Sequence, residues 1–190
     1  MKNALEVEPR VLGYENGTTL GTIVTLGQYY TVDGQSAQAE PLLRQALEVQ
    51  TRLYGQNDRN VLVTSTYLAV AILLGTNRSE SRVKEAVEFA RRAFKAYPDG
   101  DTFIVTFALA EYRSGHQIEA TNILKPLQDV DEPQVQFLLA MTQWRQGDRT
   151  GALHSFSKGV DGMKQNSNPI YPVKPLWAEA AALLRKAPPA

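Results

Sequence analysis

Apolar side chains recur along this chain every three or four residues, which is the spacing of one face of an α-helix. Within residues 20–53 two such faces follow each other. They consist of Ile23, Leu26, Gly27 and Tyr30, and of Ala39, Leu43, Ala46 and Leu47. Gly34 lies between them and breaks the first helix, and Ser36 is a suitable N-cap for the second. Two amphipathic helices joined by a glycine turn are typical of an αα-hairpin.

The same hairpin pattern recurs later in the chain. A five-residue step from a turn glycine to a small residue marks three hairpins, at Gly34 to Ala39, Gly115 to Ala120, and Gly147 to Ala152. A less regular hairpin lies between the first two of these, with its first helix predicted over residues 61–74. Its second helix is predicted to end at Pro98, because proline and the glycine that follows it stop helices.

Part of the first hairpin also matches the start of the chain. Residues 4–13 read ALEVEPRVLG and residues 46–55 read ALEVQTRLYG, 42 positions apart. Self-similarity at a period of about 20–50 residues indicates stacked structural repeats. Residues 4–13 are therefore predicted to be the end of a second helix whose first helix is missing.

These marks resemble the tetratricopeptide repeat (TPR). That family places a small residue within the first helix, an aromatic residue soon after it, glycine at the turn and alanine five residues later. The matching positions are Gly27, Tyr30, Gly34, Ala39 and Ala46; Ala69, Ala86, Ala93 and Pro98; Ala108, Tyr112, Gly115 and Ala120; and Ala140, Trp144, Gly147 and Ala152. The first half is similar to the longer kinesin-light-chain-like variety and the second half to the shorter one.

The resemblance implies an all-α fold, a right-handed α-solenoid of TPR helix-turn-helix repeats. Residues 1–190 are predicted to form a single TPR solenoid domain. Its parts are a partial repeat at 3–13, repeats at 18–55, 58–98, 101–131 and 133–164, and a capping helix at 172–187, with Trp177 as the central contact of the cap. An unrelated helical bundle is the alternative fold.

Two residues depart from the family pattern. Pro126 lies within the second helix of the third repeat, where it removes a backbone hydrogen bond, so this helix is predicted to end or bend near Lys125. Gly159 replaces the alanine expected in the fourth repeat, and it is predicted to loosen the last turn of that helix.

Composition and charge limit the function. The chain has 20 Lys and Arg residues against 20 Asp and Glu residues, so no net field attracts nucleic acid or an anionic membrane. It has no cysteine, which excludes disulfides and cysteine nucleophiles and fits a soluble protein of the reducing cytoplasm. No apolar run reaches the ~18–20 residues that would span a bilayer. The basic residues between 82 and 95 alternate with glutamates, which favours a solvated helix face over nucleic-acid binding.

No group of residues in the sequence is typical of an enzyme. His116 and His154 are 38 residues apart and have no acidic partner pattern, so both are interpreted as surface residues and no metal site is predicted. The glycines between residues 13 and 21 lack the strand and the lysine of a phosphate-binding loop. We therefore expect a protein without catalytic residues or a cofactor.

The TPR resemblance implies that first helices line a concave groove that binds a partner. The positions it assigns to that groove are Val24, Gln28, Thr66, Val70, Val105, Leu109, Tyr112, Arg113, Phe137, Met141, Trp144 and Arg145. Two binding patterns of the family are absent. Chaperone-binding members hold an acidic C-terminal peptide with a set of Lys, Asn and Arg side chains, and kinesin-like members present rows of Asn in the groove. What remains is an apolar trough with arginines on its rim, suited to a peptide with apolar anchors. The alternative interpretation is that several of these residues belong to the core.

Three functions remain open. The leading hypothesis is a non-catalytic protein-protein interaction scaffold. The second is a self-association or regulatory module, in which the N-terminal half-repeat offers an apolar face to a second copy. The third is an accessory domain of a larger protein, because the closing helix resembles the TPR tails of bacterial kinases and other effectors.

Overall fold

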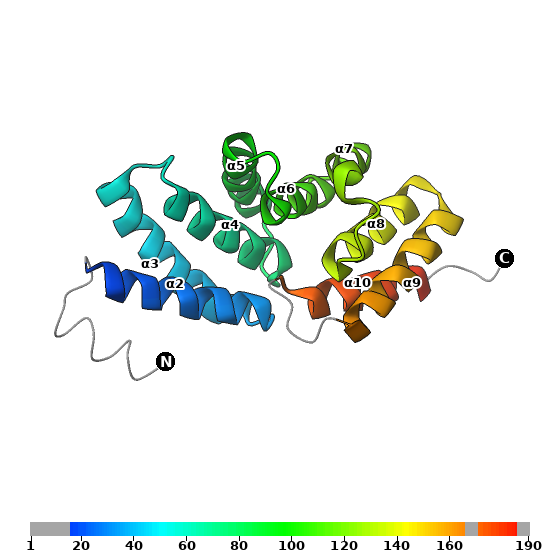
Figure 1. Cartoon of the computed structure of the whole chain (residues 1–190), viewed down its shortest axis with the longest axis horizontal. Helices are drawn as coiled ribbons and strands as arrows, with labels where there is room; N and C mark the ends of the chain where they lie inside the picture. Colours follow the sequence, from blue (N-terminus) through cyan, green and yellow to red (C-terminus); the bar gives the residue numbers. More distant parts are fainter. Residues whose placement is uncertain (1–15, 166–170, 186–190) are drawn as a thin grey trace. The chain divides into compact units, whose positions relative to one another are not determined.

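The computed structural model describes residues 16–165 and 171–185, and every regular element in these ranges is a helix. The chain divides into two compact units. The first contains α2 (Gly17–Val32), α3 (Ser36–Tyr54), α4 (Arg59–Leu74) and α5 (Glu80–Ala96) (Figure 1). The second contains α6 (Asp101–Arg113), α7 (Gln117–Leu124), the short 3₁₀ helix η1 (Lys125–Leu127), α8 (Pro133–Gln146), α9 (Arg149–Gln165) and α10 (Val173–Arg185).

Three hairpin turns share one backbone geometry. Gly34, Gly115 and Gly147 have φ angles of 77°, 86° and 90°, a region that favours glycine. The residue after each glycine donates its N–H to the carbonyl five residues back. These bonds run from Gln35 to Tyr30, from His116 to Glu111 and from Asp148 to Gln143. This is the hydrogen-bond pattern of a Schellman turn, so the repeated glycine step in the sequence corresponds to a repeated local structure.

In the first unit, α2 packs against α3 and α4 packs against α5, while α4 also contacts α2 and α3. Leu20 and Ile23 of α2 form a buried cluster with Ala46 of α3. At Gly27, a Cβ would lie 2.7 Å from the side chain of Leu43. A small residue is therefore required where α2 and α3 cross, as the repeat pattern predicts.

The second unit repeats this arrangement. The helix α6 packs against α7, α8 packs against α9, and α8 also contacts α6 and α7. Finally α10 contacts both α8 and α9, as the first helix of another hairpin would. The largest fully buried side chain of α10 is that of Leu176, whereas Trp177 is 40% exposed, so the prediction that Trp177 makes the central contact is wrong. Consecutive residues of a helix point about 100° apart, so Leu176 can face the core while Trp177 faces solvent.

Two sequence predictions about single residues have opposite outcomes. The helix α7 ends at Leu124 and continues only as η1, which confirms the effect predicted for Pro126. Ser36, in contrast, is the first residue of α3 and not its N-cap. The N-cap is Gln35, whose side chain makes no capping hydrogen bond. The Schellman turn at Gly34 ends α2 by satisfying its last carbonyls, and α3 follows directly after it.

Gly159 has a different role from the one predicted. The helix α9 continues without a break to Gln165, so its last turn is not loosened there. A Cβ on Gly159 would lie 2.7 Å from the ring of Phe137 in α8. The glycine is therefore the place where the Phe137 ring lies directly against α9, and it contributes to close packing between the two helices.

The predicted limits of the repeats and their union in a single domain stay predictions. The partial repeat at residues 3–13 lies outside the described residues, as does the surface through which it would mediate self-association.

Candidate functional site

Seven of the twelve predicted groove residues are buried. Their exposed fractions lie between 0% and 6%, and they are Thr66, Val70, Val105, Leu109, Tyr112, Phe137 and Met141. This is the environment expected from the core interpretation of these positions. The first helices are apolar on more than one face, because each packs against its own second helix and against the neighbouring hairpin. We therefore do not propose these seven side chains as direct partner contacts.

The two arginines predicted for the rim differ in environment. Arg113 of α6 donates hydrogen bonds to both carboxylate oxygens of Glu179 in α10, and its side chain is only 10% exposed. Arg145 is exposed. Trp144 is half-buried, and the guanidinium of Arg149 lies 3.8 Å from the centre of its ring. Arg113 thus holds the last helix in place, while Trp144 and Arg145 retain contact with solvent.

The other two predicted residues, Val24 and Gln28, lie together in a pocket of about 340 Å³. We call it the α2 pocket. One face of α2 forms its longest wall, with Gly17, Leu20, Gly21, Val24, Thr25 and Gln28. The remaining lining residues are Gln50 and Tyr54 of α3, and Asn60, Val63 and Thr64 of α4. None of these lining residues is charged, so the pocket presents amides, hydroxyls and apolar surface.

Two glycines keep the α2 wall open. A Cβ built on Gly17 or Gly21 would meet no atom within 4 Å. In the interior of a helix, glycine costs about 1 kcal/mol relative to alanine. The glycines are thus not required by the packing of unit 1, and their absent side chains leave space beside α2.

Two buried polar atoms of the α2 pocket lack a hydrogen-bond partner. Gln50 is 6% exposed and Thr64 is fully buried. The Oε1 atom of Gln50 and the Oγ1 atom of Thr64 make no hydrogen bond. Buried polar atoms in proteins almost always have a hydrogen-bond partner, so two exceptions in one pocket require an explanation.

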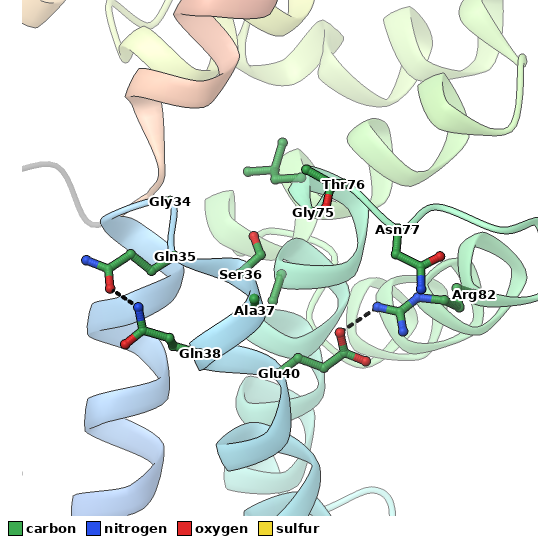
Figure 2. A pocket seen from close by; sticks show the side chains of 12 residues that line it. Gly34, Gln35, Ser36, Ala37, Gln38, Glu40, Gly75, Thr76, Asn77 and Arg82 are labelled. Carbon is green, nitrogen blue, oxygen red and sulfur yellow. Dashed lines mark hydrogen bonds and ion pairs between the residues drawn. The ribbon is translucent and has the colours of Figure 1, made fainter.

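A second pocket, of about 450 Å³, lies where the turn before α3 faces the end of α4 (Figure 2). We call it the turn pocket. Its polar side chains pair largely with each other: Gln38 donates to Gln35, and Arg82 donates to Glu40. Burial opposes ionisation of Glu40, but hydrogen bonds from Arg82 and Arg44 outweigh it and hold the pKa of the Glu40 carboxyl below its ordinary value. One buried atom of the turn pocket, Arg82 Nε, makes no hydrogen bond, but the Arg82 guanidinium already pairs with Glu40, and we do not assign this pocket a ligand.

Of the residues that line the α2 pocket, only Val24 and Gln28 were among the groove positions predicted from the sequence. Gln50 follows Leu43 and Ala46 at helical spacing, so it interrupts the buried stripe of α3 with an amide. Thr64 likewise lies within a run of buried residues in α4. A polar residue within an apolar helix face could have indicated a buried polar site. Whether such a residue lines a pocket depends, however, on which helices pack together there.

The described residues contain no group of three His, Cys, Asp or Glu side chains that could hold a metal ion. His116 and His154 are both exposed, which confirms their interpretation as surface residues. The His116 Nδ1 atom lies 2.6 Å from a carboxylate oxygen of Glu111. Within residues 16–165 and 171–185, no helix has the length and apolar character to cross a membrane.

Within each unit the hairpins stack in chain order: α4 contacts both α2 and α3, α8 contacts both α6 and α7, and α10 contacts both α8 and α9. This arrangement defines the class of all-α repeat solenoids. Within this class the chain has the TPR-like fold, which solved structures share. A kinesin-light-chain protein of Podosopora anserina with nearly identical TPR-like repeats superposes with a TM-score of 0.60 at 19% identity, covering 88% of this chain and 86% of that one. Its single-substitution variant gives a TM-score of 0.62 at 19% identity, covering 86% and 84%.

A thermophilic TPR protein of Thermus thermophilus is also similar, with a TM-score of 0.51 at 17% identity, covering 87% of this chain and 99% of that one. No protein-family model matches the sequence, and no curated protein matches it. These likenesses confirm the predicted all-α repeat fold.

Proposed function

We propose that this chain is a non-catalytic interaction module that binds a peptide segment of a partner protein, and that the α2 pocket is part of the binding surface. The observation that carries the proposal is an open pocket of about 340 Å³ lined by a continuous face of α2 and by residues of α3 and α4. Repeat scaffolds use such surfaces, formed by several consecutive helices, to hold extended or helical peptides.

The chemistry of the pocket supports peptide binding over catalysis. Amides and hydroxyls alternate with apolar surface, as in Gln28, Asn60 and Val63. Such groups can pair with a peptide main chain and cover apolar side chains, but none of them is a strong acid, base or nucleophile without an activating neighbour. The lack of cysteine in the sequence supports a role in the reducing cytoplasm.

The proposal can be tested by filling the pocket. Gly21→Phe should project a ring into the space beside α2 without a clash, because a Cβ at this position meets nothing within 4 Å. We expect peptides selected from a random library against the wild-type chain to lose at least tenfold in affinity for this variant. Gly21→Ala is the matched small-side-chain variant, since it adds one methyl group to the same wall, and it should lose much less affinity than Gly21→Phe.

Thermal unfolding of both variants establishes that they are folded before affinity is compared by calorimetry. Equal affinity of the selected peptides for the wild type, Gly21→Ala and Gly21→Phe would contradict the role of the α2 pocket. A library that yields no binding peptide would contradict the interaction module itself.

A further inference from the structure

We propose that the α2 pocket recognises the side-chain carboxamide of an Asn or Gln residue of the bound peptide, through Gln50 and Thr64. This inference rests on the proposed peptide-binding function and specifies the chemistry of the ligand. It starts from the two buried atoms without partners, Gln50 Oε1 and Thr64 Oγ1, which both belong to residues that line the pocket.

The hydrogen-bonding capacities of these two residues match a carboxamide. An amide oxygen such as Gln50 Oε1 accepts hydrogen bonds, and a hydroxyl such as that of Thr64 both donates and accepts. A carboxamide supplies two N–H donors and one carbonyl acceptor, so its N–H can pair with Gln50 Oε1 while its carbonyl accepts from Thr64 Oγ1. One planar group thereby satisfies both atoms that lack partners.

Other ligand groups fit less well. A charged side chain would be desolvated among lining residues that include no opposite charge, which is strongly unfavourable. An apolar side chain would leave Gln50 and Thr64 without partners, so it would gain nothing from them. A main-chain peptide unit has the right groups, but both side chains are more than nine-tenths buried. A group on a narrow stem can reach them more easily than the backbone of an extended chain can.

The surroundings of the two residues agree with this assignment. Gln50 reaches the pocket from the C-terminal half of α3 and Thr64 from the N-terminal half of α4. Gly21 and Gly17 leave the opposite wall open, so a side chain can enter from the α2 side. Gln50 Oε1 is buried, so the proposal requires the amide to turn toward an entering carboxamide on its stem of three rotatable bonds.

The direct probe is N-acetyl-glutamine N-methylamide, titrated into the ¹⁵N-labelled full chain and followed by NMR. We expect saturable shifts of the backbone amides near Gly21, Gln50 and Thr64. The methionine analogue lacks the carboxamide, the glutamate analogue carries a charge, and the alanine analogue keeps only the main chain. Each should bind at least tenfold more weakly. Equal shifts with the alanine analogue would show main-chain recognition and would overturn the assignment.

Two isosteric variants test the protein side. Gln50→Met and Thr64→Val remove the polar atoms and keep the volume, and each should weaken the glutamine probe about tenfold while the melting temperature stays equal or rises. Thr66→Val is the matched control in the same helix, because the Thr66 hydroxyl donates to the Leu62 carbonyl at 2.7 Å and Thr66 does not line the pocket. Unchanged affinity in Gln50→Met and Thr64→Val would overturn the assignment.

The peptides selected from the library separate this inference from the function on which it rests. Selected peptides should contain Asn or Gln, and replacing that residue with methionine should cost about tenfold in affinity. Peptides that lack both residues, yet lose affinity for Gly21→Phe, would overturn the carboxamide assignment and leave the peptide-binding function standing. Peptides unaffected by Gly21→Phe would overturn both.

Discussion

At the scale of single residues, glycines in the helices have two opposite roles. Gly27 and Gly159 are required by contacts, since a Cβ at either would lie 2.7 Å from a side chain of the facing helix, Leu43 or Phe137. Gly21 is not required by any contact, since a Cβ there meets nothing within 4 Å. The same residue type therefore allows close packing at two positions and leaves a pocket open at a third.

The substitutions Gly159→Ala and Gly21→Ala should change stability in opposite directions. At Gly159 the added methyl group presses on the fully buried ring of Phe137. We expect an overpacking cost of about 1–3 kcal/mol, only partly offset by the ~1 kcal/mol gain in helix propensity. At Gly21 the added methyl group meets no atom, so we expect only the gain of about 1 kcal/mol in helix propensity.

Urea denaturation of both variants measures these changes in the free energy of unfolding. A gain in stability for Gly159→Ala equal to that for Gly21→Ala would contradict close packing against Phe137. Gly159→Ala should cost less in a Phe137→Leu background than in the wild type, because that background lacks the ring that the methyl group meets.

At the scale of elements, the segment between α7 and α8 depends on one buried amide. Pro126 stops α7, and the chain must then turn before α8 begins at Pro133. Gln136 of α8 is 1% exposed, and its Nε2 donates to the carbonyls of Gln128 and Val130 at 2.9 and 2.8 Å. The side chain thus replaces the helical hydrogen bonds that end with α7.

Replacing this amide should loosen the connection. Gln136→Leu keeps a similar volume but leaves both carbonyls without their donor, and we expect a loss of about 1–2 kcal/mol in the free energy of unfolding. Gln146→Leu is the matched control: Gln146 is exposed and also donates two hydrogen bonds, to Gln117 O and Thr121 Oγ1. Water can replace its bonds, so its loss should stay below about 0.5 kcal/mol. Equal losses in thermal or urea unfolding would contradict a special role for Gln136.

At the scale of the whole molecule, a repeat protein is stabilised by the sum of its hairpins and the interfaces between neighbours. One such interface joins the second helices of the first two hairpins by charge. Arg44 of α3 donates to both carboxylate oxygens of Glu85 in α5 at 2.7 Å, and to Glu40 at 3.0 Å. Arg82 of α5 donates back to Glu40. The hydrogen bond with Glu85 is the main reason that the pKa of Arg44 is raised.

This network predicts how stability depends on pH. Because the pKa of Glu40 is lowered in the folded state, its contribution is complete above the unfolded value of about 4.3 and is lost as pH falls through the folded value. We expect Glu40→Gln to lower the free energy of unfolding by about 1 kcal/mol at pH 7. The difference from the wild type should shrink below about pH 4, where Glu40 becomes protonated in both states.

Urea denaturation between pH 7 and pH 3 measures this difference, and amide hydrogen exchange locates it in α3 and α5. The control is Glu88→Gln, because Glu88 is exposed and pairs with Arg91 in its own helix. A constant difference between Glu40→Gln and the wild type over the whole pH range would contradict ionisation of Glu40 as its source.

The sequence by itself determined the local structure of this protein. Helical periodicity, the glycine step at three turns and Pro126 predicted where helices begin and end, and their recurrence predicted stacked hairpins. These features depend on interactions between residues within a few positions of each other, so they can be read from the chain. Val24 and Gln28, which the sequence predicted to lie on one face of a helix, both line the α2 pocket.

Only the tertiary structure decided which helix faces remain exposed. Phe137 and Met141 were predicted to face a groove and are fully buried, Arg113 pairs with Glu179 sixty-six residues later, and Leu176 replaces Trp177 in the core. The α2 pocket combines residues of α2, α3 and α4 that are far apart in sequence. Exposure depends on which helices pack against a face, and a rotation of one residue, about 100° around a helix, exchanges core for surface.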